Sequence, residues 1–137
     1  MSPSVSENTR RLVRERAQDR CEYCRMVQVI QGATFHIEHI IPRSKGGRTI
    51  LENLALACPS CNFHKADHTQ SQDPETEQVV SLFHPQQDNW PEHFRFEGSK
   101  IVGITPMGRA TVALLDFNSE RRLLIRAIER ALGLPPL

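Results

Sequence analysis

The sequence has few aromatic residues, no long hydrophobic run and no cysteine outside two short motifs. Only 6% of its 137 residues are aromatic, so a core must be built mostly from aliphatic side chains. No apolar stretch is long enough to span a bilayer, and none near Met1 resembles a secretion signal. These absences exclude a membrane-spanning protein and predict a cytoplasmic one, whose cysteines are reduced and available to a metal.

The net charge of +1 conceals a difference between the two halves of the chain. Residues 1–65 carry ten Lys/Arg and six Asp/Glu, a net of +4, whereas residues 66–137 carry seven and ten, a net of −3. A surface that binds nucleic acid is therefore expected on the first half. The excess is too small to identify such a partner by itself.

All four cysteines lie in two Cys-x-x-Cys motifs, Cys21–Cys24 and Cys58–Cys61, with 33 residues between them. Two such turns commonly supply the closed tetrahedron of thiolates that a structural zinc ion requires. A redox dithiol needs only one pair, and four unrelated cysteines would not repeat the spacing. The motifs predict a structural Zn²⁺ held by Cys21, Cys24, Cys58 and Cys61.

Apolar and turn-forming residues predict a mixture of helices and short strands. Ser4 and Glu7 resemble a capping box that opens a helix over about 5–19. Between and after the cysteine motifs, the pattern predicts strands at about 34–40 and 50–57 and a helix over 59–67. Further along, we expect strands at 79–83, 93–96 and 101–104 and helices at 105–117 and 118–132.

The elements divide into three regions. Residues 1–68 form the expected zinc-bound core, residues 69–78 a polar linker or exposed loop, and residues 79–137 an extension that packs on the core. In the loop, acidic side chains such as Asp73 are expected to be solvated. In the extension, Trp90 is a candidate anchor to the core. The last helix gathers its apolar residues on one face, formed by Leu123, Leu124, Ala127, Ile128 and Ala131.

The segment between the cysteine motifs contains the adjacent residues Glu38 and His39 and, further on, Asn53. Asn62 and Lys65 follow the last cysteine. The stretch FHIEHIIPRSKGGRTILENLALACPSCNFHKAD (35–67) resembles the HNH endonuclease family, and in particular its small, zinc-bound bacterial members. The resemblance is specific over about residues 20–68.

This resemblance implies an α+β fold whose centre is a ββα-metal (His-Me finger) core. It implies that His39 is the general base, that Glu38 and Asn62 hold a catalytic Mg²⁺ or Mn²⁺, and that Asn53 braces the loop and orients His39. The residue types suit the chemistry, because a neutral imidazole accepts a proton near pH 7. Carboxylate and amide oxygens are the ligands that hard cations prefer.

The sequence departs from the family pattern at two ligand positions. Glu38 stands where Asp or His is common, and Ala66 stands where some members have a third ligand, a histidine. His36 lies two residues before Glu38 on the same expected strand face and is an additional candidate ligand, although a structural histidine is an equally good interpretation.

The basic residues nearest to the expected site are Arg43, Lys45 and Lys65, which are candidate phosphate contacts. The resemblance implies that the partner is DNA, with RNA as an alternative. Two other classes of function remain open: a zinc-stabilised nucleic-acid-binding module without catalysis, and a zinc domain for protein interaction. The complete set of Glu38, His39, Asn53 and Asn62 favours the enzyme, because a binding module needs no base beside a metal carboxylate.

Overall fold

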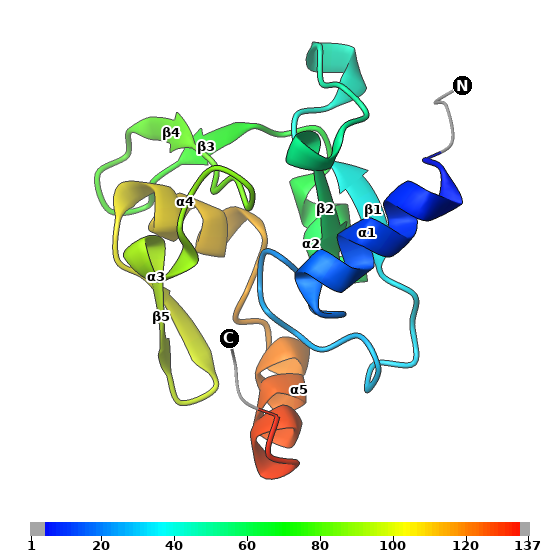
Figure 1. Cartoon of the computed structure of the whole chain (residues 1–137). Helices are drawn as coiled ribbons and strands as arrows, with labels where there is room; N and C mark the ends of the chain where they lie inside the picture. The colour runs from blue at the N-terminus through cyan, green and yellow to red at the C-terminus, as the bar shows by residue number, and fades with distance from the viewer. Residues whose placement is uncertain (1–4, 135–137) are drawn as a thin grey trace.

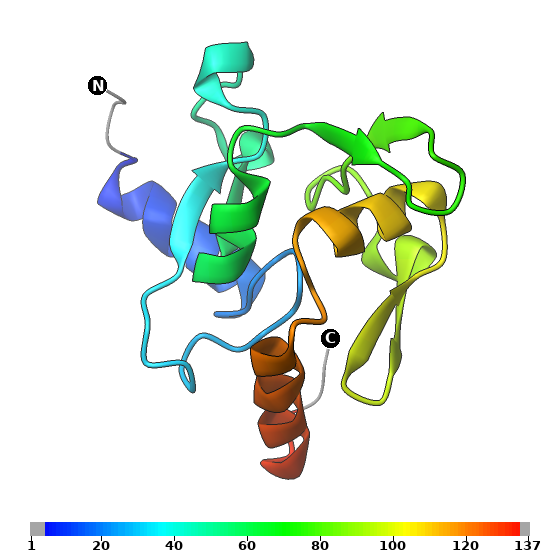
Figure 2. The same cartoon turned by 180° about the vertical axis from the view of Figure 1, so that it is seen from behind.

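A two-stranded hairpin lies at the centre of the N-terminal half (Figure 1). Strand β1 (His36–His39) pairs antiparallel with β2 (Leu54–Ala57), which places His39 opposite Leu54. Helix α1 (Glu7–Ala17) covers one face of the hairpin and α2 (Pro59–Lys65) the other, as Figures 1 and 2 show from opposite sides. The computed structural model describes residues 5–134.

Local sequence explains where these elements begin. The hydroxyl of Ser6 accepts a hydrogen bond from the backbone N–H of Thr9 (3.2 Å), so Ser6 caps α1; the predicted cap, Ser4, lies outside the described residues. All four residues of β2 are buried between the helices, which matches their apolar sequence Leu-Ala-Leu-Ala. Two 3₁₀ turns, Arg43–Lys45 and Leu51–Asn53, shape the loop that joins the strands.

The C-terminal half contains two further hairpins and three helices, beside the first half in both views (Figures 1 and 2). Its elements are β3 (Gln70–Gln72), β4 (Val79–Ser81), α3 (Trp90–His93), β5 (Phe94–Glu97), β6 (Lys100–Gly103), α4 (Pro106–Leu114) and α5 (Glu120–Ala131). Strand β3 pairs antiparallel with β4, and β5 with β6. The chain therefore has the expected mixture of helices and short antiparallel strands, and none of its described helices is long and apolar enough to cross a membrane.

The segment expected to be a polar linker is instead part of a hairpin. β3 and the turn after it occupy most of residues 69–78, and Asp73 in that turn has no exposed surface. Its two carboxylate oxygens accept hydrogen bonds from Nε and Nη2 of Arg109 on α4, at 3.0 and 2.9 Å. Asp73 is thus buried in a bidentate ion pair, because an arginine far along the chain reaches it, and is not solvated as expected.

In α5, charged side chains face the interior and several apolar side chains face solvent, which is the reverse of the usual arrangement. The buried residues of α5 are Arg122, Arg126 and Glu129. Leu124, Ile128 and Leu132 are exposed by 64%, 53% and 62% of their surfaces. The charged face turns inward because buried acceptors from the rest of the chain, including the carbonyls of residues 115 and 117, face it.

Among the polar contacts that join the halves, two involve Trp90 and Gln86. The indole N–H of Trp90 donates to the carbonyl of Tyr23 at 2.8 Å, so Trp90 does anchor the extension to the first cysteine motif. The Gln86 amide donates to Glu22 Oε2 at 2.9 Å. Glu22 Oε1 in turn accepts from the N–H of Leu56 on β2 and from Arg16 on α1, so a single carboxylate connects α1, β2 and the extension.

Candidate functional site

The four cysteines lie together in the interior. Their sulfur atoms are all within 4.8 Å of one another, and all four residues are buried. The Sγ atoms of Cys24 and Cys58 are 3.7 Å apart, close to the about 3.8 Å that a tetrahedron with Zn–S bonds of about 2.3 Å requires. Backbone N–H groups within each motif point at the sulfurs, from Cys24 to Cys21 (3.5 Å) and from Cys61 to Cys58 (3.4 Å). The cluster is therefore arranged for a metal ion.

Arg122 of α5 closes this cluster from the C-terminal half. Its Nη2 lies 2.8 Å from the sulfur of Cys61, and its Nη1 donates to the carbonyls of Leu115 and Asp116. Burial works against a charged guanidinium, but the thiolates of Cys61, Cys24 and Cys58 raise the pKa of Arg122 above its usual value. The guanidinium stays charged and offsets negative charge on the thiolates. Nothing in the local sequence distinguishes Arg122 from its neighbour Arg121, so sequence reasoning missed it.

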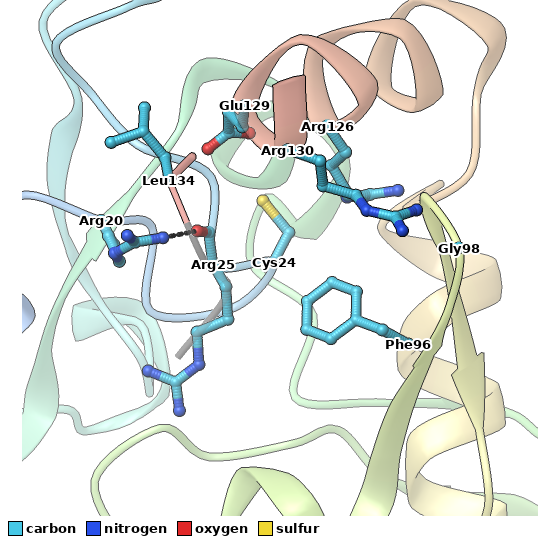
Figure 3. Close-up of a pocket in the computed structure, with 9 residues that line it drawn as sticks. All are labelled: Arg20, Cys24, Arg25, Phe96, Gly98, Arg126, Glu129, Arg130 and Leu134. Carbon is cyan, nitrogen blue, oxygen red and sulfur yellow. Dashed lines mark hydrogen bonds between the residues drawn. The ribbon is translucent and has the colours of Figure 1, made fainter. Parts of the chain in front are cut away.

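A shallow pocket lies next to the cluster on the α5 side (Figure 3). The sulfur of Cys24 lies in its wall, with Phe96 from β5 and Glu129 from α5. Although four arginines surround it, Figure 3 shows the guanidinium of Arg25 directed away from those of Arg126 and Arg130. The arginines do not converge, so the pocket is not built to bind an anion.

Glu38 is buried at the centre of the hairpin face that α2 covers. The Tyr23 hydroxyl donates to its Oε1, and Nζ of Lys65 lies 4.0 Å from the same oxygen. Burial raises the pKa of Glu38 to about 7, and the opposing effects of Lys65 and the Tyr23 hydrogen bond do not cancel this rise. Within residues 5–134, Oε2 has no hydrogen-bond partner. One carboxylate oxygen is thus held in place, and the other is available to a ligand.

Lys65 is placed differently from the prediction. We expected its amine to contact phosphate, but only 1% of its surface is exposed, and Nζ donates to the carbonyl of Ile40 at 2.7 Å. A phosphate contact requires a surface position. The amine instead connects α2 to the end of β1 and provides a positive charge beside Glu38.

His39 is oriented by a residue that the sequence analysis did not single out. Its Nε2 lies 2.8 Å from the hydroxyl oxygen of Thr49, in the loop between the strands. Burial, assisted by the nearby charge of Arg43, lowers the pKa of His39, which keeps the imidazole neutral at neutral pH. The only sequence signal for Thr49 is a hydroxyl side chain between the two glycines and Asn53.

Asn53 holds the loop that follows His39. Its side-chain oxygen accepts from the N–H of Ile41 (2.9 Å), and its amide nitrogen donates to the carbonyls of Ile41 (3.0 Å) and Arg48 (2.9 Å). These hydrogen bonds join the two ends of the loop, while the direct hydrogen bond to His39 comes from Thr49. Gly47 fits closely beside this contact, because a Cβ there would lie 1.7 Å from the carbonyl oxygen of Ile41 and 2.9 Å from the Asn53 amide.

The remaining predicted residues lie nearer the surface. Asn62 on α2 is half-buried and His36 on β1 is exposed, and neither side chain forms a hydrogen bond with the described part of the chain. Arg43 is exposed, as a phosphate contact requires. Lys45 is exposed as well, but its amine donates to the carbonyl of Asp67 after α2, at 2.8 Å.

The comparison with known families covers this same part of the chain. Residues 21–70 match the HNH endonuclease family. The match confirms the resemblance found in the sequence and associates this HNH segment with nuclease and nucleic-acid-related activity. No curated protein and no solved structure matches the chain.

The HNH segment begins at Cys21 and ends at Gln70, inside β3. It therefore contains all four cysteines and every predicted site residue, whereas Arg122 lies outside it. The β4–α5 region adds Arg122, which contacts the cysteine cluster, and Trp90, which donates to the carbonyl of Tyr23.

Proposed function

We propose that the protein is a metal-dependent endonuclease that hydrolyses phosphodiester bonds in DNA. One observation carries the proposal: within the HNH segment, Glu38 and His39 are adjacent on β1, each fixed at one atom and open at another. A binding module has no use for such a pair. RNA is the alternative substrate.

Two oxygen donors fit a divalent cation. Glu38 offers its unengaged Oε2 and Asn62 its side-chain oxygen, from the strand and the helix that pack together. These are hard ligands, which suit Mg²⁺ or Mn²⁺, and His36 is a further candidate ligand. When bound, such an ion would neutralise charge that develops on the phosphate. The buried environment of Glu38 strengthens its interaction with a cation.

His39 acts as the general base in this proposal. With Nε2 carrying the proton and donating to Thr49, Nδ1 is left with a lone pair that accepts a proton from the attacking water. Asn53 acts by holding the loop that carries Thr49 and by fixing the chain after His39. It positions the base and takes no part in proton transfer.

The cysteine cluster supplies the scaffold. We propose that Cys21, Cys24, Cys58 and Cys61 hold a structural Zn²⁺, and that β1, β2 and α2 form a ββα-metal core around the catalytic ion. A closed set of four thiolates leaves zinc no open position for substrate. Arg43, and Lys45 to a lesser degree because its amine is already bound, are proposed to contact backbone phosphates, which position the substrate without reading sequence.

The experiment is cleavage of supercoiled plasmid by the purified protein with Mg²⁺, Mn²⁺ or a chelator. His39→Ala should lower the cleavage rate by about 10²–10⁴-fold, while His68→Ala, an exposed histidine, should not. Glu38→Gln and Asn62→Ala should be partly rescued by excess ion, and His39→Ala should not be.

Zinc content and circular dichroism of each variant separate lost chemistry from lost fold. Cleavage that survives His39→Ala would disprove the mechanism. A wild-type protein that binds DNA but cuts neither DNA nor RNA with any divalent ion would establish the non-catalytic binding module.

A further inference from the structure

A cavity of about 350 Å³ lies between the HNH segment and the C-terminal half. Its size falls in the range of roughly 300–1,000 Å³ that is typical of small-molecule sites. Its lining includes Ile40, Lys65, Gln70, Ser81, Leu82 and Met107. The wall therefore combines residues from the end of β1, from α2 and from the two hairpin strands, with α4 closing one side.

The cavity adjoins the candidate catalytic residues. Ile40 and Ile41 directly follow His39 in the chain, and Lys65, whose amine is 4.0 Å from Glu38, contributes to the same wall. Glu38 and His39 themselves do not line the cavity, so a substrate whose phosphate binds at these two residues would place a neighbouring group, not the phosphate, in the cavity.

The charges in the wall exclude an anion or a metal ion as its natural occupant. Lys65 and Asp88 carry opposite charges, and the Lys65 amine is already bound to the carbonyl of Ile40. His84 is neutral at neutral pH, because burial lowers its pKa against the opposing effect of Asp88. A wall without net charge favours a neutral ligand.

The remaining chemistry of the wall suits a flat, polar ring. Thr69, Ser81 and Gln87 are lining residues whose side chains form no hydrogen bond with residues 5–134, so their donors and acceptors are available. Leu82 and Met107 provide apolar surface beside them. Apolar faces with hydrogen-bonding groups around an edge are what a nucleobase requires.

We propose that this cavity binds one unpaired nucleobase of the nucleic acid, next to the phosphodiester bond that is cut. The proposal rests on the proposed nuclease function and names its substrate class. A base can enter a cavity only when it is out of the duplex stack, so the favoured substrate is single-stranded or locally unpaired. The C-terminal half then has a role in substrate selection in addition to covering the cysteine cluster.

The test uses the full chain and a set of single-stranded oligonucleotides, each with one abasic position. An abasic site removes a base and keeps the phosphates. Binding is measured in Ca²⁺ or chelator and cleavage in Mg²⁺ or Mn²⁺. One position beside the cut should weaken binding by about 5- to 150-fold, the range expected for one stacked base. A paired duplex should bind more weakly than the single strand.

Substitutions in the cavity wall test whether the weaker binding of the abasic oligonucleotide arises there. Ser81→Ala combined with Gln87→Ala removes polar groups that have no partner in the described chain, so the fold should persist. This variant should lose the difference between the intact and the abasic oligonucleotide, whereas Gln78→Ala, an exposed glutamine outside the cavity, should retain it.

Equal binding of all abasic oligonucleotides, or an abasic effect that persists in the double variant, would overturn the proposal. Either result can occur in a protein that still cuts nucleic acid, so it would leave the nuclease function intact. A wild-type protein that cuts nothing but still binds one abasic oligonucleotide more weakly than the intact one would support base binding in the cavity and reject the catalytic function.

Discussion

The guanidinium of Arg122 lies 2.8 Å from the sulfur of Cys61, although 61 residues separate them in the chain. A zinc ion with four thiolates carries two net negative charges, and burying that charge is costly unless a cation accompanies it. Arg122 is 1% exposed and would be that cation for a zinc ion in the cysteine cluster. The cysteine cluster is therefore a structure of five residues, one of which lies outside the HNH segment.

The first prediction concerns this arginine. Arg122→Met should lower zinc affinity by about 10–100-fold, the usual effect of removing a residue that hydrogen-bonds to a metal ligand. Arg121→Met, which replaces the exposed neighbour, is the matched control and should change nothing. Competition with a chromophoric chelator measures both. Equal zinc affinity in the two variants would mean that the contact does not support metal binding.

The second prediction concerns the orientation of His39. Thr49→Val keeps the shape of the side chain and removes the hydroxyl that lies 2.8 Å from Nε2. The cleavage rate should fall, but by less than in His39→Ala, because the base is present and only its orientation is lost. Thr49→Ser should restore most of the rate. The measurement is the cleavage rate of each variant at saturating substrate. A Thr49→Ser protein as slow as Thr49→Val would contradict the role of the hydroxyl.

The third prediction concerns Gly47. An added Cβ would meet the carbonyl oxygen of Ile41 at 1.7 Å, so Gly47→Ala must displace the loop that Asn53 holds. Overpacking of this kind costs about 1–3 kcal/mol, and cleavage should fall with it. Gly46→Ala is the control: its Cβ meets nothing within 4 Å, and only the strain of φ = 88° remains. Gly47→Ala should have a lower urea midpoint and a slower plasmid cleavage rate than Gly46→Ala.

The fourth prediction concerns pH. The ion pair with Arg109 holds the pKa of Asp73 well below its usual range. The ionised form is therefore favoured in the folded state, so its contribution is complete at neutral pH and is lost as the pH falls below about 4. Asp73→Asn should lower the urea midpoint at pH 7 and flatten its decline between about pH 5 and pH 2.

Glu75→Gln serves as the control for this effect, because Glu75 contacts the same arginine from a side chain that is 69% exposed. Exposed ion pairs contribute little, so its profile should remain close to the wild type. Parallel acid profiles for wild type and Asp73→Asn would show that the buried ion pair does not set the acid stability.

The parts of this structure that follow from local sequence could be predicted, and the parts that depend on distant partners could not. The cysteine spacing and the alternation around Glu38 and His39 are local, and the structure has a sulfur cluster and a strand there. The inward face of α5 was not predictable, because its arginines are buried only where carbonyls and thiolates from distant segments meet them. The burial of Asp73 was not predictable either, because its partner Arg109 lies 36 residues away in the chain.

Within the site, the residue types were easier to predict than their contacts. Glu38 and His39 were recognised from their chemistry, but Thr49 was not, because a threonine in a polar loop has no distinguishing pattern. Lys65 appeared to be a surface cation because lysines usually are. Its buried position depends on the carbonyl of Ile40 and the carboxylate of Glu38, which only the packing of α2 against β1 brings into reach.

The contact between Glu129 and Val27 has a consequence for how the protein is made. The Glu129 carboxylate accepts a hydrogen bond from the N–H of Val27 at 2.8 Å, across 102 residues of chain. A ribosome releases the cysteine motifs and the proposed catalytic residues long before it releases α5. During that interval the thiolates lack Arg122, and the turn after Cys24 lacks its acceptor. The HNH segment is therefore completed by a helix that is synthesised well after it, so chains that stop before α5 would leave the sulfur cluster uncovered.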